Sequence, residues 1–80
     1  MTKEMLIALA EAYAEHNRLT LSTVSTYAAD DGKYFRNLRE GAGLTLRKAE
    51  RLLHWFDQAW PADLAWPASI PRPSRKQATA

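Results

Sequence analysis

Apolar side chains recur every three or four residues in four separate segments of this chain, the spacing of amphipathic helices. The spacing predicts helices over residues 3–15, 21–29, 32–40 and 46–59. The first of these has an apolar stripe made of Met5, Leu6, Leu9, Ala12 and Tyr13. We therefore expect an all-α fold, a compact bundle of four to five helices.

Residues that start and stop helices flank the four segments. Thr2, Thr20 and Thr45 each stand directly before a segment, where a threonine side chain can accept a hydrogen bond from the first helical turn. Residues 30–32 (Asp-Asp-Gly) and 41–43 (Gly-Ala-Gly) are breaker clusters. Either aspartate of the first cluster can cap the helix that follows. The helix over residues 32–40 is expected to begin at the glycine.

Helical spacing also divides each later segment into an inward and an outward face. In the second segment the inward set is Leu21, Val24 and Ala28, with Tyr27 as a further candidate, and the outward set is Ser22, Thr23, Ser25 and Thr26. In the third, Phe35 and Leu38 point inward. The expected stripe of the fourth is Leu46, Ala49, Leu52, Leu53, Phe56 and Trp60.

Length and composition narrow the class of protein. Eighty residues form one domain with a small core, and the absence of cysteine excludes disulfides and thiolate metal sites. No apolar run approaches the roughly 18 residues of a membrane span, and no secretion signal follows Lys3, so a cytoplasmic protein is expected. His16 and His54 lack partners at ligand-like spacing, and no glycine-rich oxyanion loop is visible. We expect no enzyme activity, metal, cofactor, membrane contact or small-molecule ligand.

Four prolines change the character of the chain after Trp60. Residues 1–60 form the expected domain, residues 61–70 an apolar proline-containing extension, and residues 71–80 a disordered basic tail. The apolar residues of the extension pack either on the bundle or on a second subunit. A homodimer is expected because a small core benefits from oligomerisation. Its interface would use Trp55, Trp60, Leu64 and Trp66.

Positive charge is concentrated in the middle of the chain. Residues 31–54 carry six lysines and arginines against three carboxylates, whereas residues 1–30 carry two against four. Such a distribution suits a surface that faces phosphate, although a solvated charged face has the same composition.

The second and third segments fit the internal logic of a helix-turn-helix. With Leu21 as the first position of a twenty-residue unit, Ser25 supplies the small residue where the helices cross, and Phe35 and Leu38 supply two anchors three residues apart. Residues 3–60 therefore resemble the lambda-repressor-like helix-turn-helix family, especially its small phage and prophage regulators. The chain departs from that family at Ala29, where glycine is usual, and in lacking a glutamine at the start of the second helix.

The resemblance implies that the helix over residues 32–40 enters the major groove of duplex DNA. Base edges would be contacted by Asp31, Gly32, Lys33, Arg36, Asn37 and Glu40. Phosphates would be contacted by Ser22, Thr23, Ser25, Thr26, Arg39, Arg47, Lys48 and Arg51. Arginine can bond guanine twice, and asparagine can do the same with adenine.

Two functions remain open at this point. The first is a transcriptional regulator, a dimeric repressor that binds an inverted-repeat operator and controls its own operon. Regulators that accompany anti-CRISPR genes are one group of this kind. The second is a helical protein-binding module, an adaptor or a phage-encoded inhibitor, that uses the C-terminal tryptophans and ignores DNA.

Overall fold

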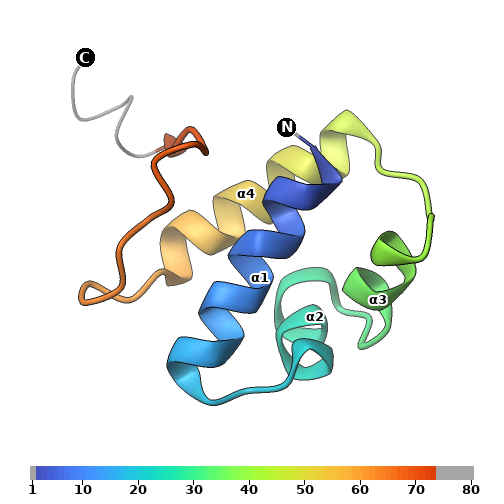
Figure 1. Ribbon diagram of the computed structural model, residues 1–80. Helices are drawn as coiled ribbons and strands as arrows, with labels where there is room; N and C mark the ends of the chain where they lie inside the picture. The colour runs from blue at the N-terminus through green and yellow to red at the C-terminus, as the bar shows by residue number, and fades with distance from the viewer. Residues whose placement is uncertain (1, 74–80) are drawn as a thin grey trace.

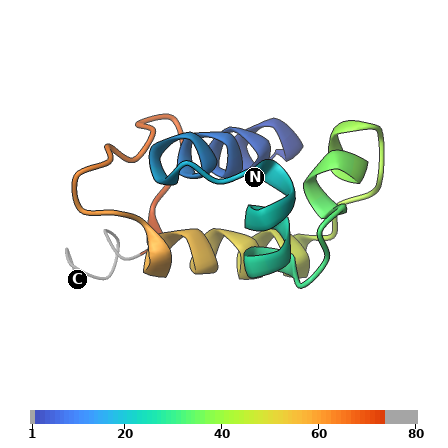
Figure 2. The ribbon, with the colours of Figure 1, turned by 90° about the horizontal axis from the view of Figure 1, so that it is seen from below.

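Four helices and no strand make up residues 2–73, the part of the chain that the computed structural model describes (Figure 1). They are α1 (Lys3–Asn17), α2 (Leu21–Ala29), α3 (Tyr34–Arg39) and α4 (Leu46–Ala59). Helices α1 and α4 lie side by side and run in roughly the same direction, while α2 contacts each of the other three (Figures 1 and 2). None of these helices is long and apolar enough to cross a membrane.

Three threonines cap helices as the sequence predicts. Thr2 Oγ1 accepts from the backbone N–H of Met5 at 3.2 Å, and Thr20 and Thr45 accept in the same way from the third residue of α2 and α4 at 3.1 Å. Each cap of this type stabilises a helix start by about 1 kcal/mol. Helix α1 runs two residues beyond its predicted end and stops where Arg18 adopts a left-handed conformation, with φ at 56°.

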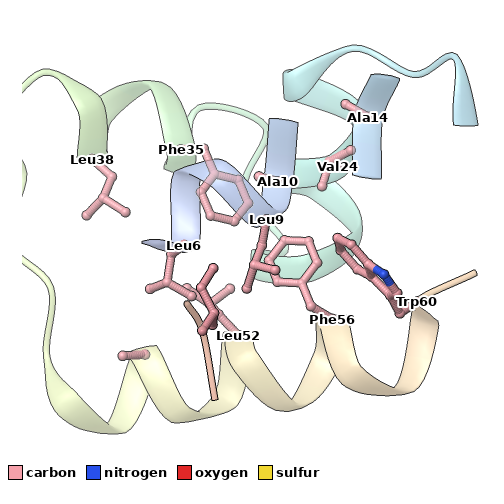
Figure 3. Close-up of a cluster of buried hydrophobic side chains, with 12 residues drawn as sticks. Leu6, Leu9, Ala10, Ala14, Val24, Phe35, Leu38, Leu52, Phe56 and Trp60 are labelled. Carbon is pink, nitrogen blue, oxygen red and sulfur yellow. The ribbon is translucent and has the colours of Figure 1, made fainter. Parts of the chain in front are cut away.

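The core collects apolar side chains from all four helices (Figure 3). Phe35 of α3 and Phe56 of α4 meet at its centre, with ring centroids 6.0 Å apart. The predicted stripes of α1, α3 and α4 supply most of its other members: Leu6, Leu9, Leu38, Ala49, Leu52 and Trp60. Because aromatic rings bury large apolar areas, these two phenylalanines tie α3 to the opposite side of the fold.

Two predicted core residues are instead exposed. Leu46 is 71% exposed because it begins α4, one turn before the first covered position at Ala49. Tyr27 is 58% exposed because α2 buries Val24 and Ser25. Two residues beyond Ser25 correspond to about 200° of helical rotation, so Tyr27 points to solvent.

The segment after α4 folds back on its own chain rather than extending away. The indole N–H groups of Trp60 and Trp66 donate to the carbonyl oxygens of Leu64 and Ile70, both at 2.8 Å. The centroids of the two indole rings lie 5.0 Å apart, and Ile70 is buried. The sequence left open whether this segment packs on the bundle or on a second subunit, and in the structure it packs on the bundle. The interface role predicted for Trp60 does not fit, because its ring is buried in the core of the same chain.

An ion pair fixes the end of this segment. Arg72 Nε donates to Asp57 Oδ1 at 2.7 Å, the Asp57 side chain is only 2% exposed, and the guanidinium lies 4.9 Å from the centre of the Trp66 ring. His16 Nε2 lies 3.1 Å from Asp63 Oδ1, a second link between the segment and the bundle. The prediction that residues 71–80 form a disordered tail is therefore wrong at Arg72. Residues 74–80 lie outside the described part of the chain.

Candidate nucleic-acid interface

The connection between α2 and α3 is a four-residue turn, residues 30–33. Asp30 ends α2 in a left-handed conformation, with φ at 57°. Asp31 then uses both its side chain and its carbonyl oxygen, accepting from the backbone N–H groups of Lys33 at 3.0 Å and Tyr34 at 3.1 Å. This turn delays the next helix, so α3 begins at Tyr34. The prediction that it begins at Gly32 is wrong, because Gly32 and Lys33 belong to the turn.

Gly32 packs closely against α2. A Cβ atom at Gly32 would lie 3.1 Å from Ser22 Oγ and 3.2 Å from Thr26 Oγ1, closer than such contacts normally are. The turn therefore lies directly against the outer side of α2, and a larger residue would require these two hydroxyl groups to shift by a few tenths of an ångström. This packing brings the start of α3 beside the first turn of α2.

Helix α3 is held from behind by two apolar anchors and one hydrogen bond. Phe35 and Leu38 are both buried, as predicted. The backbone N–H of Phe35 donates to Ser25 Oγ at 3.2 Å, and Ser25 is 1% exposed. The expected small residue between α2 and α3 is confirmed. Ser25 cannot, however, face phosphate as its outward assignment requires, because its hydroxyl is enclosed between the two helices.

The opposite side of α3 and its preceding turn is polar and open to solvent. Lys33, Arg36, Asn37 and Glu40 are all exposed. A hollow of about 320 Å³ lies between this side and α2, bordered by Leu21, Ser22, Ser25, Gly32, Lys33, Arg36 and Arg39. Among the described residues, no carboxylate lies within 4.0 Å of the Lys33 or Arg36 charge. Two uncompensated cations beside a hydroxyl-lined hollow favour an anionic ligand.

The hydroxyl groups predicted to contact phosphate differ in availability. Ser22 is exposed and borders the hollow. Thr26 is also exposed, and its Oγ1 donates to the carbonyl oxygen of Ser22 at 3.1 Å. Thr23 is half-buried, and its Oγ1 lies 2.9 Å from Thr20 Oγ1, within the cap of α2. Ser22 therefore remains the hydroxyl best placed for a ligand in the hollow.

The cations predicted on α4 fall into two groups. Lys48 Nζ lies 5.1 Å from the centre of the Tyr34 ring, so this side chain reaches from α4 to the start of α3. Arg47 and Arg51 border a separate hollow of about 710 Å³ on the outer side of α4, together with Trp55. Neither arginine borders the hollow between α2 and α3, so sequence proximity overstated how closely the cations gather.

Two residues near this surface were not anticipated from the sequence. Glu11 of α1 forms an ion pair with Arg39 of α3. The pair joins residues 28 positions apart, a separation at which no helical periodicity predicts contact. The hydroxyl of Tyr34 is buried and has no hydrogen-bond partner within residues 2–73, and burial raises the pKa of Tyr34 above its usual value of 10.0. Tyr34 stands between Lys33 of the turn and the buried Phe35, and nothing in this local sequence signals a buried hydroxyl.

The described residues form no group of three histidine or carboxylate side chains that could hold a metal ion. The surface formed by α2, the turn and α3 combines exposed hydroxyl, amide and cationic groups with the exposed carboxylates of Asp30, Asp31 and Glu40. Comparison of the chain with protein-family models, curated proteins and solved structures finds no match.

Proposed function

We propose that this protein is a sequence-specific duplex-DNA-binding regulator, a dimeric repressor that acts at an inverted-repeat operator in the cytoplasm of a bacterial or phage-infected cell. One observation carries the proposal. Helix α3 is fixed from behind by Phe35 and Leu38, and on its free side it exposes Arg36 and Asn37. A pinned helix with exposed guanidinium and amide groups is what direct recognition of bases in the major groove requires.

Each exposed group has a plausible target on DNA. Arg36 can donate two hydrogen bonds to guanine, and Asn37 can bond adenine through both its oxygen and its nitrogen. Lys33, in the turn, would reach a base or a phosphate. Ser22, at the start of α2, would contact a phosphate oxygen on the neighbouring strand. Glu40, at the other end of α3, would accept a hydrogen bond from a base that carries a donor and would disfavour bases that present only acceptors.

The short length of α3 supports the dimeric form of the proposal. Six residues span roughly 9 Å, which corresponds to about three base pairs of duplex. Such a helix reads too few bases to select one site by itself. Two copies related by a twofold axis would read two half-sites about 34 Å apart, one turn of DNA. The contact between copies is proposed on α4 and residues 61–70, where Trp55, Leu64 and Trp66 remain partly exposed.

Repression would follow from occupancy alone. A dimer seated on an operator excludes polymerase from the same DNA, and an operator upstream of its own gene would make the protein autoregulatory. Under this proposal the protein needs neither enzyme activity nor a cofactor.

The competing function, a protein-binding module that uses the C-terminal tryptophans, has less support. Trp60 is buried, and the indole N–H groups of Trp60 and Trp66 both donate to carbonyl oxygens of the same chain. Buried Trp60 cannot anchor a partner, and under this proposal the partly exposed Trp55, Leu64 and Trp66 serve the contact between copies. Lys33 and Arg36, by contrast, have no ion-pair partner among the described residues that would explain their placement.

The proposal is tested by selecting bound duplexes from a random pool with the full-length protein. The expected result is enrichment of an inverted repeat, bound with steep salt dependence by a particle whose light-scattering mass is that of two chains. A pool without enriched sequences, together with no binding to random duplex or heparin at low salt, would contradict the proposal and favour the adaptor.

A further inference from the structure

One of the three cations beside the hollow is already held by a carboxylate of the same chain. Arg39 borders the hollow with Lys33 and Arg36. Its guanidinium forms an ion pair with Glu11 of α1, and the two side chains are 50% and 55% exposed. Lys33 and Arg36 have no such partner among the described residues. The ion pair therefore singles out Arg39 from its neighbours.

We propose that Glu11 restrains Arg39 and so lowers the affinity of this surface for DNA phosphate. In the free protein the Glu11 carboxylate pairs with the Arg39 guanidinium. In the complex with DNA, a phosphate oxygen replaces the carboxylate as the partner of Arg39. This inference rests on the proposed DNA-binding function and adds a built-in limit to it. The same donor groups of arginine serve carboxylate and phosphate, so the two anions compete directly.

Exposure makes the exchange accessible. An ion pair that is half open to water is weak, because solvent and salt screen it and because both side chains lose freedom by forming it. A duplex presents a dense row of phosphates, and each neutralised phosphate releases a counterion. The pair can therefore open on DNA, but opening it carries a cost that a neutral residue at position 11 would not impose.

The restraint acts on affinity and not on sequence preference. Phosphates are the same at every base pair, so a contact from Arg39 carries no sequence information. Removing the Glu11 charge should therefore strengthen binding to an operator and to random duplex by the same factor.

The test compares Glu11→Gln with Glu15→Gln in the full chain. Glu15 lies one turn further along α1, is exposed and has no ion-pair partner among the described residues, so it controls for the loss of one negative charge. By fluorescence anisotropy at low salt, Glu11→Gln should bind both duplexes about twofold to fivefold more tightly, within the upper part of the range for one exposed ion pair. Glu15→Gln should change affinity by no more than about 1.5-fold.

An Arg39→Ala background completes the cycle. If Glu11 acts through Arg39, the gain from Glu11→Gln falls to that of Glu15→Gln when Arg39 is absent. Equal effects of the two glutamines, a gain that persists without Arg39, or weaker binding by Glu11→Gln would each overturn the inference. Thermal melting of every variant shows whether a lost gain reflects unfolding.

A heparin fragment, used as a second probe, separates this inference from the proposed function. Duplex binding without a gain from Glu11→Gln overturns the restraint and leaves the DNA-binding function standing. A gain measured on heparin, with no duplex binding by any variant, overturns DNA binding and supports a restraint on Arg39 toward polyanions in general.

Discussion

The backbone N–H of Phe35 donates a hydrogen bond to Ser25 Oγ across ten residues of chain, inside the core of the protein. This bond joins the middle of α2 to the first turn of α3. A backbone N–H in the first turn of a helix has no partner within that helix, and burial makes an unpaired one costly. Ser25 satisfies this group and so fixes the distance and orientation between the two helices.

Ser25→Ala should destabilise the fold by about 1–2 kcal/mol, because the buried N–H of Phe35 loses its acceptor. Urea denaturation followed by tryptophan fluorescence measures the change. Ser22→Ala is the matched control, since Ser22 is exposed on the same helix. The control should unfold like the unaltered protein and weaken binding to all duplexes. If the two variants were equally stable, the bond from Phe35 to Ser25 would not contribute as described.

Arg36→Ala should weaken operator binding by about 1–3 kcal/mol and relax the preference at one base pair, because a bidentate contact to a base is lost. Competition of the operator against single-base variants in gel-shift titrations measures both effects. Arg47→Ala is the comparison, because Arg47 lies outside the hollow and would contact phosphate only. It should lower affinity for every sequence and flatten the salt dependence. Unchanged operator affinity in Arg36→Ala would refute the assignment of α3.

Arg72→Ala should destabilise the protein by about 1–3 kcal/mol, less than a fully buried pair because Arg72 remains partly exposed. The variant removes the guanidinium from a carboxylate that is almost fully buried, and it also removes the contact with the Trp66 ring. Thermal unfolding of Arg72→Ala measures this loss. Thermal unfolding of the double variant Arg72→Ala with Asp57→Asn then shows how much of the loss comes from the Asp57 charge. The double variant should recover part of the loss. A larger loss in the double variant would mean that the ion pair is not what Arg72 contributes.

Tyr34→Phe should leave stability within about 1 kcal/mol of the unaltered protein, on the stabilising side, because it removes a buried hydroxyl that lacks a partner. The substitution keeps the ring beneath Lys48. Since burial raises the pKa of Tyr34 above 10.0, the unfolded chain releases this proton first as the pH rises. The stability that depends on the protonated hydroxyl is therefore complete below pH 10.0 and declines above it. The difference between the melting temperatures of the two proteins should stay constant below pH 10.0 and change only in that alkaline range.

Much of the fold could be predicted because the responsible interactions are local. The caps at Thr2, Thr20 and Thr45 act within three residues, and α4 occupies the range that its apolar spacing predicts. The anchors Phe35 and Leu38 followed from the same period. The sequence also predicted part of the candidate surface, since Lys33, Arg36 and Asn37 are exposed as expected.

The late start of α3 and the exposure of Tyr27 have local causes, but other errors depend on whether residues distant in sequence come into contact. Ser25 was placed with the outward hydroxyl residues as a phosphate contact, yet α3 covers it. Leu46 is apolar, yet no neighbouring helix reaches it. Arg39 was predicted as a phosphate contact from its charge, yet it forms an ion pair with Glu11 of α1.

The amino-acid sequence by itself determined most helix boundaries and most of each apolar side, because capping and periodicity depend on neighbouring residues. Only the tertiary structure decided which polar groups remain free for a ligand. Helix packing sets the partners of Ser25 and Arg39 and returns Arg72 to Asp57, and these pairings depend on distances across the fold that no local pattern encodes.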